Sequence, residues 1–185
     1  MKQQDQLWEV AAGQDGYVTT DDARDLGIAP VELRKLASRG TLENEAHGVY
    51  RFTRFPLAPT DRYRLAVLWT GNREAVLSHE TALDVYDLCD INPDAIDVTV
   101  PKKTRIRRRD NRGIRVFYED LKGTQIGWWN GIRCVTERTA INQAIEIGTP
   151  VYLVNQAIDN ARNTGRITEI DKEEMLRRIK DKYGY

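Results

Sequence analysis

Residues that typically begin or end a helix follow one another so closely in residues 5–52 that only short helices and strands fit between them. Thr19 and Asp22 have the spacing of a capping box, and Gly27 is a typical helix end a few residues later. Pro30 suits the first position of the next helix, and Gly40 follows its last residues. The pattern therefore predicts two short helices joined by a tight turn.

A helix before this pair and a hairpin after it complete the pattern. Apolar residues at 7–11 lie on one side of a first helix that ends near Gly13, and residues 17–18 suit a short strand. Residues 42–52 favour two strands that turn at 46–48. Three helices followed by a hairpin are typical of a winged helix-turn-helix domain.

The third helix is predicted to enter the major groove of DNA, because its apolar residues face the core and its polar residues face outward. The amides and hydroxyls that open the second helix suit a phosphate, and the hairpin lies where a wing meets the adjacent groove. The predicted DNA-contacting residues are Thr19, Thr20, Val31, Arg34, Lys35, Ser38, Arg39, His47, Tyr50 and Arg51. A winged helix that contacts protein is the alternative, since residues 1–56 have a net charge of −2.

The rest of the chain is predicted to be a small mixed domain that follows a linker with two prolines, Pro56 and Pro59. The fold class is therefore α+β, with a winged helix-turn-helix at residues 1–55 and a mixed α/β domain with C-terminal helices at residues 60–185. In this second part we expect strands at 96–100, 114–118 and 132–135, and helices at 61–69, 78–88, 136–147, 150–163 and 168–182.

Basic residues are concentrated in one segment of an otherwise balanced chain. The whole chain carries 28 basic and 28 acidic residues, yet residues 98–135 have a net charge of +7 and residues 57–97 one of −5. We name the basic residues of the segment 102–113 the basic patch; they are Lys102, Lys103, Arg105, Arg107, Arg108, Arg109 and Arg112. A binding site for a polyanion is one hypothesis. The other is a solvated hairpin whose charges keep a sheet edge soluble.

The order of several short motifs resembles that of the AbiEi-family antitoxins, which are the transcription-repressing halves of bacterial toxin–antitoxin pairs linked to abortive phage infection. In the first part the motifs are Gly16-Tyr17-Val18-Thr19-Thr20, Arg39-Gly40-Thr41-Leu42 and Gly48-Val49-Tyr50. In the second part they are Leu77-Ser78-His79-Glu80-Thr81-Ala82-Leu83, Val98-Thr99-Val100-Pro101 and Val135-Thr136-Glu137-Arg138-Thr139-Ala140.

The resemblance implies a repressor that binds inverted repeats of duplex DNA in the promoter of its own operon. It also implies a nucleotidyltransferase-like toxin as the partner, counteracted without the need for a stable complex, and an antitoxic role for the second domain. A monomer that assembles cooperatively on DNA, or a weak dimer, is expected. The basic patch would then serve antitoxicity or a second contact to nucleic acid.

Catalysis is not expected, and neither a cofactor nor a metal site is predicted. A restriction-endonuclease-like nuclease needs a D/E-x-K motif at a strand end, but Asp97-Val98-Thr99 lacks the lysine. Ser78-His79-Glu80 is interpreted as a capping serine beside a packed or surface histidine, because neighbouring residues on a helix diverge. A winged-helix regulator without a toxin, and a remnant of a nuclease-like protein, remain as alternatives.

The tryptophan pair Trp128-Trp129 suggests one further alternative, an RNA-binding or scaffold protein whose indoles stack on bases. We favour packing of this pair at the start of a strand. Cys89 and Cys134 have no metal-ligand spacing and are expected to be buried free thiols. The sequence shows neither a leader nor an apolar run of transmembrane length, so a cytoplasmic location without a membrane partner is expected.

Overall fold

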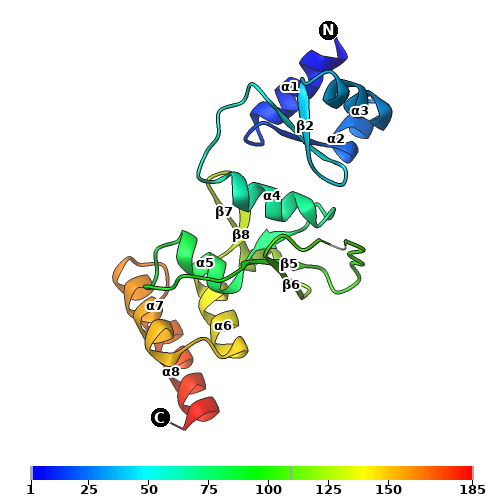
Figure 1. Cartoon of the computed structure of the whole chain (residues 1–185). Helices are drawn as coiled ribbons and strands as arrows, with labels where there is room; N and C mark the ends of the chain where they lie inside the picture. The colour runs from blue at the N-terminus through cyan, green and yellow to red at the C-terminus, as the bar shows by residue number, and fades with distance from the viewer. Residues whose placement is uncertain (1, 109, 185) are drawn as a thin grey trace. The chain divides into compact units, whose positions relative to one another are not determined.

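The computed structural model describes residues 2–108 and 110–184, and the chain divides into two compact units, Met1–Arg73 and Glu74–Tyr185 (Figure 1). Each unit has its own sheet and its own buried core. The predicted α+β class, a winged helix-turn-helix followed by a mixed domain that ends in helices, is confirmed.

The first unit contains three helices and a small sheet, followed by one more helix. Its elements are α1 (Gln3–Ala12), β1 (Tyr17–Thr19), α2 (Thr20–Asp25), α3 (Pro30–Ser38), β2 (Leu42–Ala46), β3 (Val49–Phe52) and α4 (Asp61–Trp69). The strands are antiparallel in the order β1-β3-β2, so the wing strand β3 is the central one. This arrangement presents α2 and α3 as a helix-turn-helix beside the β2–β3 hairpin.

The predicted helix signals of the first unit are confirmed in atomic detail. Thr19 Oγ1 accepts a hydrogen bond from the backbone N of Asp22 at 3.1 Å, and the Asp22 carboxylate accepts one from the backbone N of Thr19 at 2.8 Å. Gly27 follows α2 with a φ of +70°, a conformation that glycine adopts without strain. Pro30 is the first residue of α3. Local chemistry therefore fixes the turn between α2 and α3.

The core of the first unit fixes which face of α3 is turned outward. Leu33 is fully buried among residues from α1, β1 and β3, and Leu36 and Ala37 pack against the same cluster. Burial of these side chains on one helix face leaves the opposite face to solvent.

Helix α4 groups with the first unit, although the sequence division placed it at the start of the second domain. Buried charge pairs hold it there. An Nη atom of Arg51 on β3 lies 3.5 Å from the carboxylate of Asp61, and Nε of Arg64 lies 2.9 Å from the carboxylate of Asp15. Because the unpaired charges would be costly to bury, α4 and the winged helix stabilise each other.

The second unit is a five-stranded mixed sheet covered by helices. Its elements are β4 (Val76–Leu77), α5 (His79–Val85), β5 (Ile96–Val100), β6 (Ile114–Tyr118), the 3₁₀ turn η1 (Gly123–Gln125), β7 (Ile126–Trp129), β8 (Ile132–Val135), α6 (Glu137–Ile147), α7 (Val151–Asn163) and α8 (Glu169–Tyr183). Helix α5 packs on β5 and α6, while α6, α7 and α8 pack against one another (Figure 1). Strands β4 and β7 were not predicted, and α5 ends earlier than the sequence indicated.

The sheet has the strand order β6-β5-β4-β8-β7, in which β5 and β6 are parallel. The basic segment 101–113 connects these two strands, as predicted, but it is a crossover and not a hairpin turn. Parallel neighbours require such a longer connection, because the chain must return to the same end of the sheet. The alternative of a solvated hairpin is therefore wrong in its topology, whereas β6 is indeed an edge strand.

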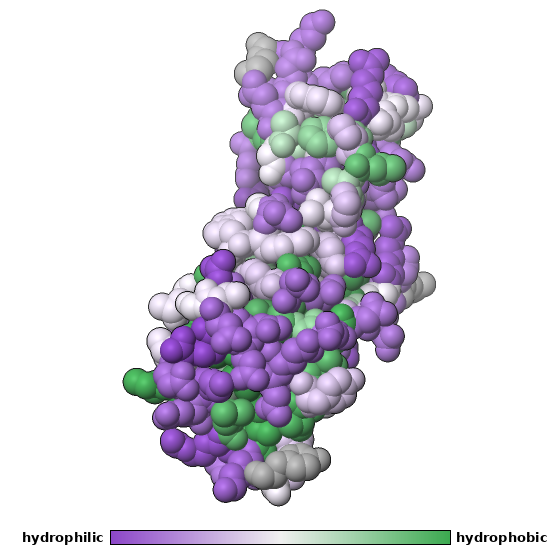
Figure 2. Space-filling model, turned by 90° about the vertical axis from the view of Figure 1, so that its left-hand side faces the viewer, coloured by the Kyte–Doolittle hydropathy of each residue, from purple (hydrophilic) through white to green (hydrophobic). Residues whose placement is uncertain are grey.

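The surface shown in Figure 2 is mostly hydrophilic, and the two cysteines are buried. Figure 2 shows one face of the molecule, on which small hydrophobic patches are separated by hydrophilic residues. Cys89 and Cys134 are buried free thiols, as predicted, and burial raises the pKa of each. Within residues 2–108 and 110–184, none of the helices combines the length and the apolar character needed to cross a bilayer.

Candidate nucleic-acid interface

The outward face of α3 and its C-cap carry five of the ten residues that the sequence assigned to DNA. Val31 is 45% exposed, and Arg34, Lys35, Ser38 and Arg39 are also exposed. Lys35 Nζ forms an exposed ion pair with Glu32 at 2.7 Å, which is a weak restraint in water. The structure therefore brings the predicted α3 residues together on one accessible surface.

Unpaired arginines distinguish this surface from the rest of the first unit. Within the described part of that unit, three arginine side chains make no ion pair, hydrogen bond or ring contact, namely Arg34, Arg39 and Arg54. The remaining arginines of the unit are engaged by carboxylates or, for Arg62, by a tyrosine. A free guanidinium can bind a phosphate or a guanine edge without first breaking an internal contact.

Arg54 was missed by sequence reasoning. It lines a groove of about 490 Å³ together with Arg39, Trp8 and Phe52. Trp8 packs edge-on against Phe52 with ring centroids 5.0 Å apart, yet it remains 39% exposed, so it lies at the rim of the core it was predicted to fill. The signal that could have found Arg54 is a basic residue two positions after the wing strand.

Two predicted wing residues are not available to DNA, and this corrects the sequence interpretation. Tyr50 belongs to the core cluster of the first unit. Arg51 is only 5% exposed, because its guanidinium donates to the carbonyl oxygens of Phe55 and Pro56 and faces Asp61. His47, at the tip of the hairpin, is exposed and remains a predicted contact.

The start of α2 has fewer free donors than the sequence suggested. The Thr19 hydroxyl donates its single hydrogen to Asp22 at 2.8 Å, and the backbone N of Thr20 donates to the carbonyl of Gly48 at 3.0 Å. Asp21 and Asp22 also place negative charge in this first turn. The predicted phosphate contact at Thr19 and Thr20 therefore lacks these two donors, because the first belongs to the cap of α2 and the second joins α2 to the wing.

The basic patch of the second unit is a solvent-accessible surface. Lys102, Lys103, Arg105, Arg107 and Arg112 are exposed and Arg108 is half-buried, whereas Arg109 lies outside the described residues. Arg112 forms an ion pair with Asp110 at 3.1 Å. The side chains of Lys102, Lys103 and Arg107 have no partner among the described residues, so they are available to an anion.

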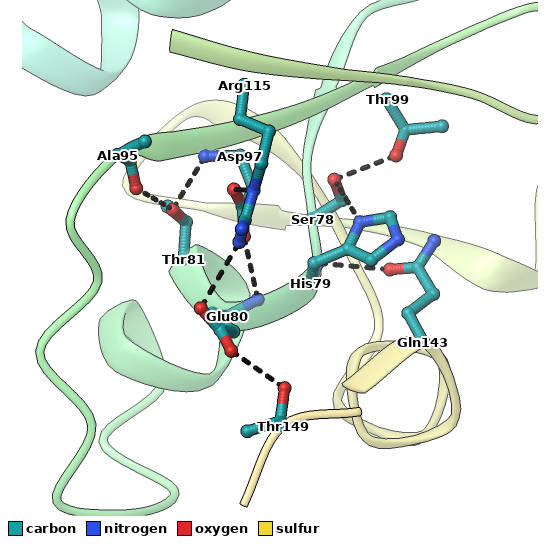
Figure 3. Close-up of polar contacts among 10 residues, drawn as sticks. All are labelled: Ser78, His79, Glu80, Thr81, Ala95, Asp97, Thr99, Arg115, Gln143 and Thr149. Atoms are coloured by element: carbon teal, nitrogen blue, oxygen red, sulfur yellow. Dashed lines mark hydrogen bonds and ion pairs between the residues drawn. The ribbon is translucent and has the colours of Figure 1, made fainter. Parts of the chain in front are cut away.

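A buried polar network surrounds the start of α5 and bears on the hydrolase alternative (Figure 3). His79 Nδ1 lies 2.9 Å from Ser78 Oγ, so these two side chains do not diverge as predicted. They meet because Ser78 is extended and His79 has a φ of +51°. However, Ser78 and His79 are 0% and 4% exposed, so a substrate has no access to this pair.

Ser78 does not cap α5 with its side chain, although the sequence predicted a capping serine. Its Oγ accepts a hydrogen bond from Thr99 Oγ1 at 2.7 Å. The first amides of α5 are satisfied by other segments: His79 N donates to Gln143 at 3.1 Å, and Glu80 N donates to Asp97 at 3.0 Å (Figure 3). Distant side chains therefore provide the cap.

The acidic residues beside this network are engaged by one arginine. Asp97 is fully buried and accepts two hydrogen bonds from Arg115, at 2.7 and 3.0 Å. Arg115 also donates to Glu80 at 3.2 Å, and Thr149 donates to the other oxygen of Glu80 at 2.8 Å. Burial raises the pKa of Asp97, and the contact with Arg115 opposes this rise. The carboxylates of Asp97 and Glu80 thus bind side chains from other elements of the unit and hold these elements together (Figure 3).

His79 is expected to make the stability of the protein depend on pH. Burial, with a smaller contribution from Arg115, lowers the pKa of His79 to about 3, whereas an unfolded histidine titrates near 6.5. Below pH 6.5 the unfolded state binds a proton that the native state does not bind. The free energy of unfolding therefore falls by about 1.4 kcal/mol per pH unit. The free energy of unfolding measured by urea titration should therefore be roughly 2 kcal/mol lower at pH 5 than at pH 7.

Two variants test this assignment. His79→Asn removes the titrating group and tolerates a positive φ, so its free energy of unfolding should change much less between pH 7 and pH 5. His47→Asn removes the exposed histidine and should retain the dependence of the parent. If the free energy of unfolding of His79→Asn depended on pH as strongly as that of the parent, another group would be responsible.

The tryptophan pair is only partly packed. Trp128 is 68% exposed on β7, so the predicted packing is wrong for this residue, whereas Trp129 is half-buried. The exposed indole lies opposite Arg133 of β8.

Comparison with known proteins finds a similar fold for most of the chain and a family match for its first part. The RV2827C protein from Mycobacterium tuberculosis has a similar fold, with a TM-score of 0.57 and 15% sequence identity over 95% of this chain and 71% of that one. No curated protein has a significantly similar sequence. Over residues 5–53 the chain matches the family model of the AbiEi antitoxin transcriptional regulators, which confirms for the winged helix the family predicted from its motifs.

Proposed function

We propose that this chain is an antitoxin that binds duplex DNA through α3, represses its own operon and counteracts a nucleotidyltransferase-like toxin. The observation that carries the DNA-binding part is the set of unpaired guanidinium groups on and beside α3, at Arg34, Arg39 and Arg54. The family match over residues 5–53 supports a regulatory role. The toxin as partner rests on the resemblance of the motifs.

In this proposal α3 lies in the major groove. Arg34 reaches a base edge, with guanine favoured by its two acceptors. Lys35 leaves its exposed pair with Glu32 and neutralises a phosphate. Arg39 and Arg54 contact the phosphates that flank the groove, and His47 contacts the backbone from the tip of the wing. The operator is an inverted repeat, which two copies occupy cooperatively or as a weak dimer in the cytoplasm.

The basic patch supplies a second, sequence-independent contact to a polyanion. Its free side chains at Lys102, Lys103 and Arg107 suit phosphates, and the crossover between β5 and β6 holds them on one connection. The same surface is the candidate for the antitoxic function that the resemblance assigns to the second domain.

Removing charge from the patch should weaken binding to all duplexes alike. In Lys103→Gln/Arg107→Gln, the slope of log K against log salt concentration is expected to flatten by about 2 units if both residues contact phosphates. Affinity for an operator selected from random duplexes and for a scrambled duplex should fall together. Fluorescence anisotropy between about 50 and 200 mM salt measures both quantities.

Arg177→Gln/Lys180→Gln is the matched control, because it removes two exposed cations from α8. It should leave the salt slope close to that of the parent. If the patch variant represses normally but fails to rescue cells from the toxin, the patch serves antitoxicity alone. If the salt slope, repression and rescue all match the parent, the patch has no role in this function.

A further inference from the structure

Val31 is an apolar side chain left in solvent on the helix that we propose reads DNA. It is the second residue of α3, is 45% exposed, and lies outside the hydrophobic residues packed on the core of the first unit. A β-branched residue at an exposed helix position does not favour the helix, because its χ1 torsion is restricted there. Neither core packing nor helix stability therefore accounts for valine at this position.

The neighbours of Val31 on this face are cationic or polar. Arg34, Lys35 and Ser38 follow it by three, four and seven residues, which places all four side chains on one side of the helix. In the major groove the base edges present donors and acceptors, except for the C5-methyl group of thymine, which is apolar. A valine among cations therefore matches this one chemical group of the groove.

We propose that Val31 contacts the C5-methyl group of a thymine and thereby sets the base preference of the first turn of α3. The inference rests on the proposed function, because it requires α3 in the major groove, where the first residues of a recognition helix contact base edges. Side chains three residues apart have Cβ atoms about 5–6 Å apart, and base pairs are about 3.4 Å apart along a strand. The thymine therefore lies one or two base pairs from the guanine contacted by Arg34.

The experiment uses the full chain and a pool of random duplexes from which bound sequences are selected. In the tightest duplex each thymine is replaced in turn by deoxyuridine, which removes only the methyl group. At one thymine in each half-site the replacement should weaken binding about three- to five-fold, the effect of losing one buried methyl group. Val31→Ala should weaken binding to the thymine duplex by a similar factor and should be insensitive to deoxyuridine at that position.

Leu57→Ala is the matched control, because it removes an exposed apolar side chain outside α3 and should retain the thymine preference. If the parent enriches no duplex, the proposed function itself fails. If a duplex is enriched but the effects of Val31→Ala and deoxyuridine are independent at every thymine, only the inference about Val31 is wrong. A changed sedimentation coefficient for Val31→Ala, with its thymine preference intact, would place Val31 in a contact between copies and also overturn it.

Discussion

Replacing Arg34 and Lys35 together with alanine is expected to abolish specific binding to the selected operator while the protein remains folded. Loss of the Arg34 contact to a base edge costs about 1–3 kcal/mol, which is roughly 5- to 160-fold in affinity, and loss of the Lys35 contact to a phosphate weakens binding further. Neither side chain faces the core, and alanine favours a helix. Band-shift titration measures the affinity, and circular dichroism checks the fold.

The control for α3 is Lys2→Ala/Arg24→Ala, which removes the same charge from the first unit at exposed positions outside the proposed recognition surface. It should lose far less affinity than the α3 variant. Equal losses in the two variants would indicate that net charge, and not the face of α3, determines binding. A folded Arg34→Ala/Lys35→Ala variant that binds the operator as tightly as the parent would remove α3 as the recognition helix.

Removing the carboxylate of Asp61 is expected to destabilise the first unit by about 3–5 kcal/mol, because it leaves the buried charge of Arg51 without its partner. The guanidinium of Arg51 is surrounded by Asp61 and by the carbonyl oxygens of Phe55 and Pro56. The variant Asp61→Asn tests this in a fragment of residues 1–73. A fragment of residues 1–55 lacks both Pro56 and Asp61 and should be less stable still.

A second aspartate–arginine pair in the same unit provides the control. Asp25 and Arg73 lie 2.6 Å apart, but both side chains are about 60% exposed, so Asp25→Asn should cost less than about 1 kcal/mol. Chemical denaturation of the 1–73 fragment compares the two variants directly. The role assigned to the Arg51–Asp61 pair would be wrong if both substitutions had the same small effect, or if the 1–55 fragment matched the 1–73 fragment in stability.

The helix boundaries and the outward face of α3 could be predicted because their causes are local. The cap at Thr19, the proline at the start of α3 and the spacing of its apolar residues all act within one or two helical turns. The same holds for strand β5, which ends just before Pro101, and for the cap at Thr136. Where neighbouring residues determine the structure, sequence reasoning placed the elements correctly.

The errors arose where distant residues decide the environment. All four residues of β3 are buried, because β1 and β2 flank this central strand and α4 brings Asp61 to Arg51. No local pattern indicates that an arginine on a wing strand has an acidic partner on a later helix. Likewise, the alternation of apolar residues predicts that β5 and β6 are strands, but it does not reveal whether they pair in parallel or antiparallel.

The remote caps of α5 have a consequence for the order in which the protein is made. Seven residues are too few for a stable isolated helix, and α5 relies on the cap from Gln143, which is 64 residues beyond His79 in the chain. At about 5–20 residues per second, the ribosome needs roughly 3–13 s to reach that cap. The nascent chain is therefore expected to complete its first unit, which ends at Arg73, before the caps of α5 have all been synthesised.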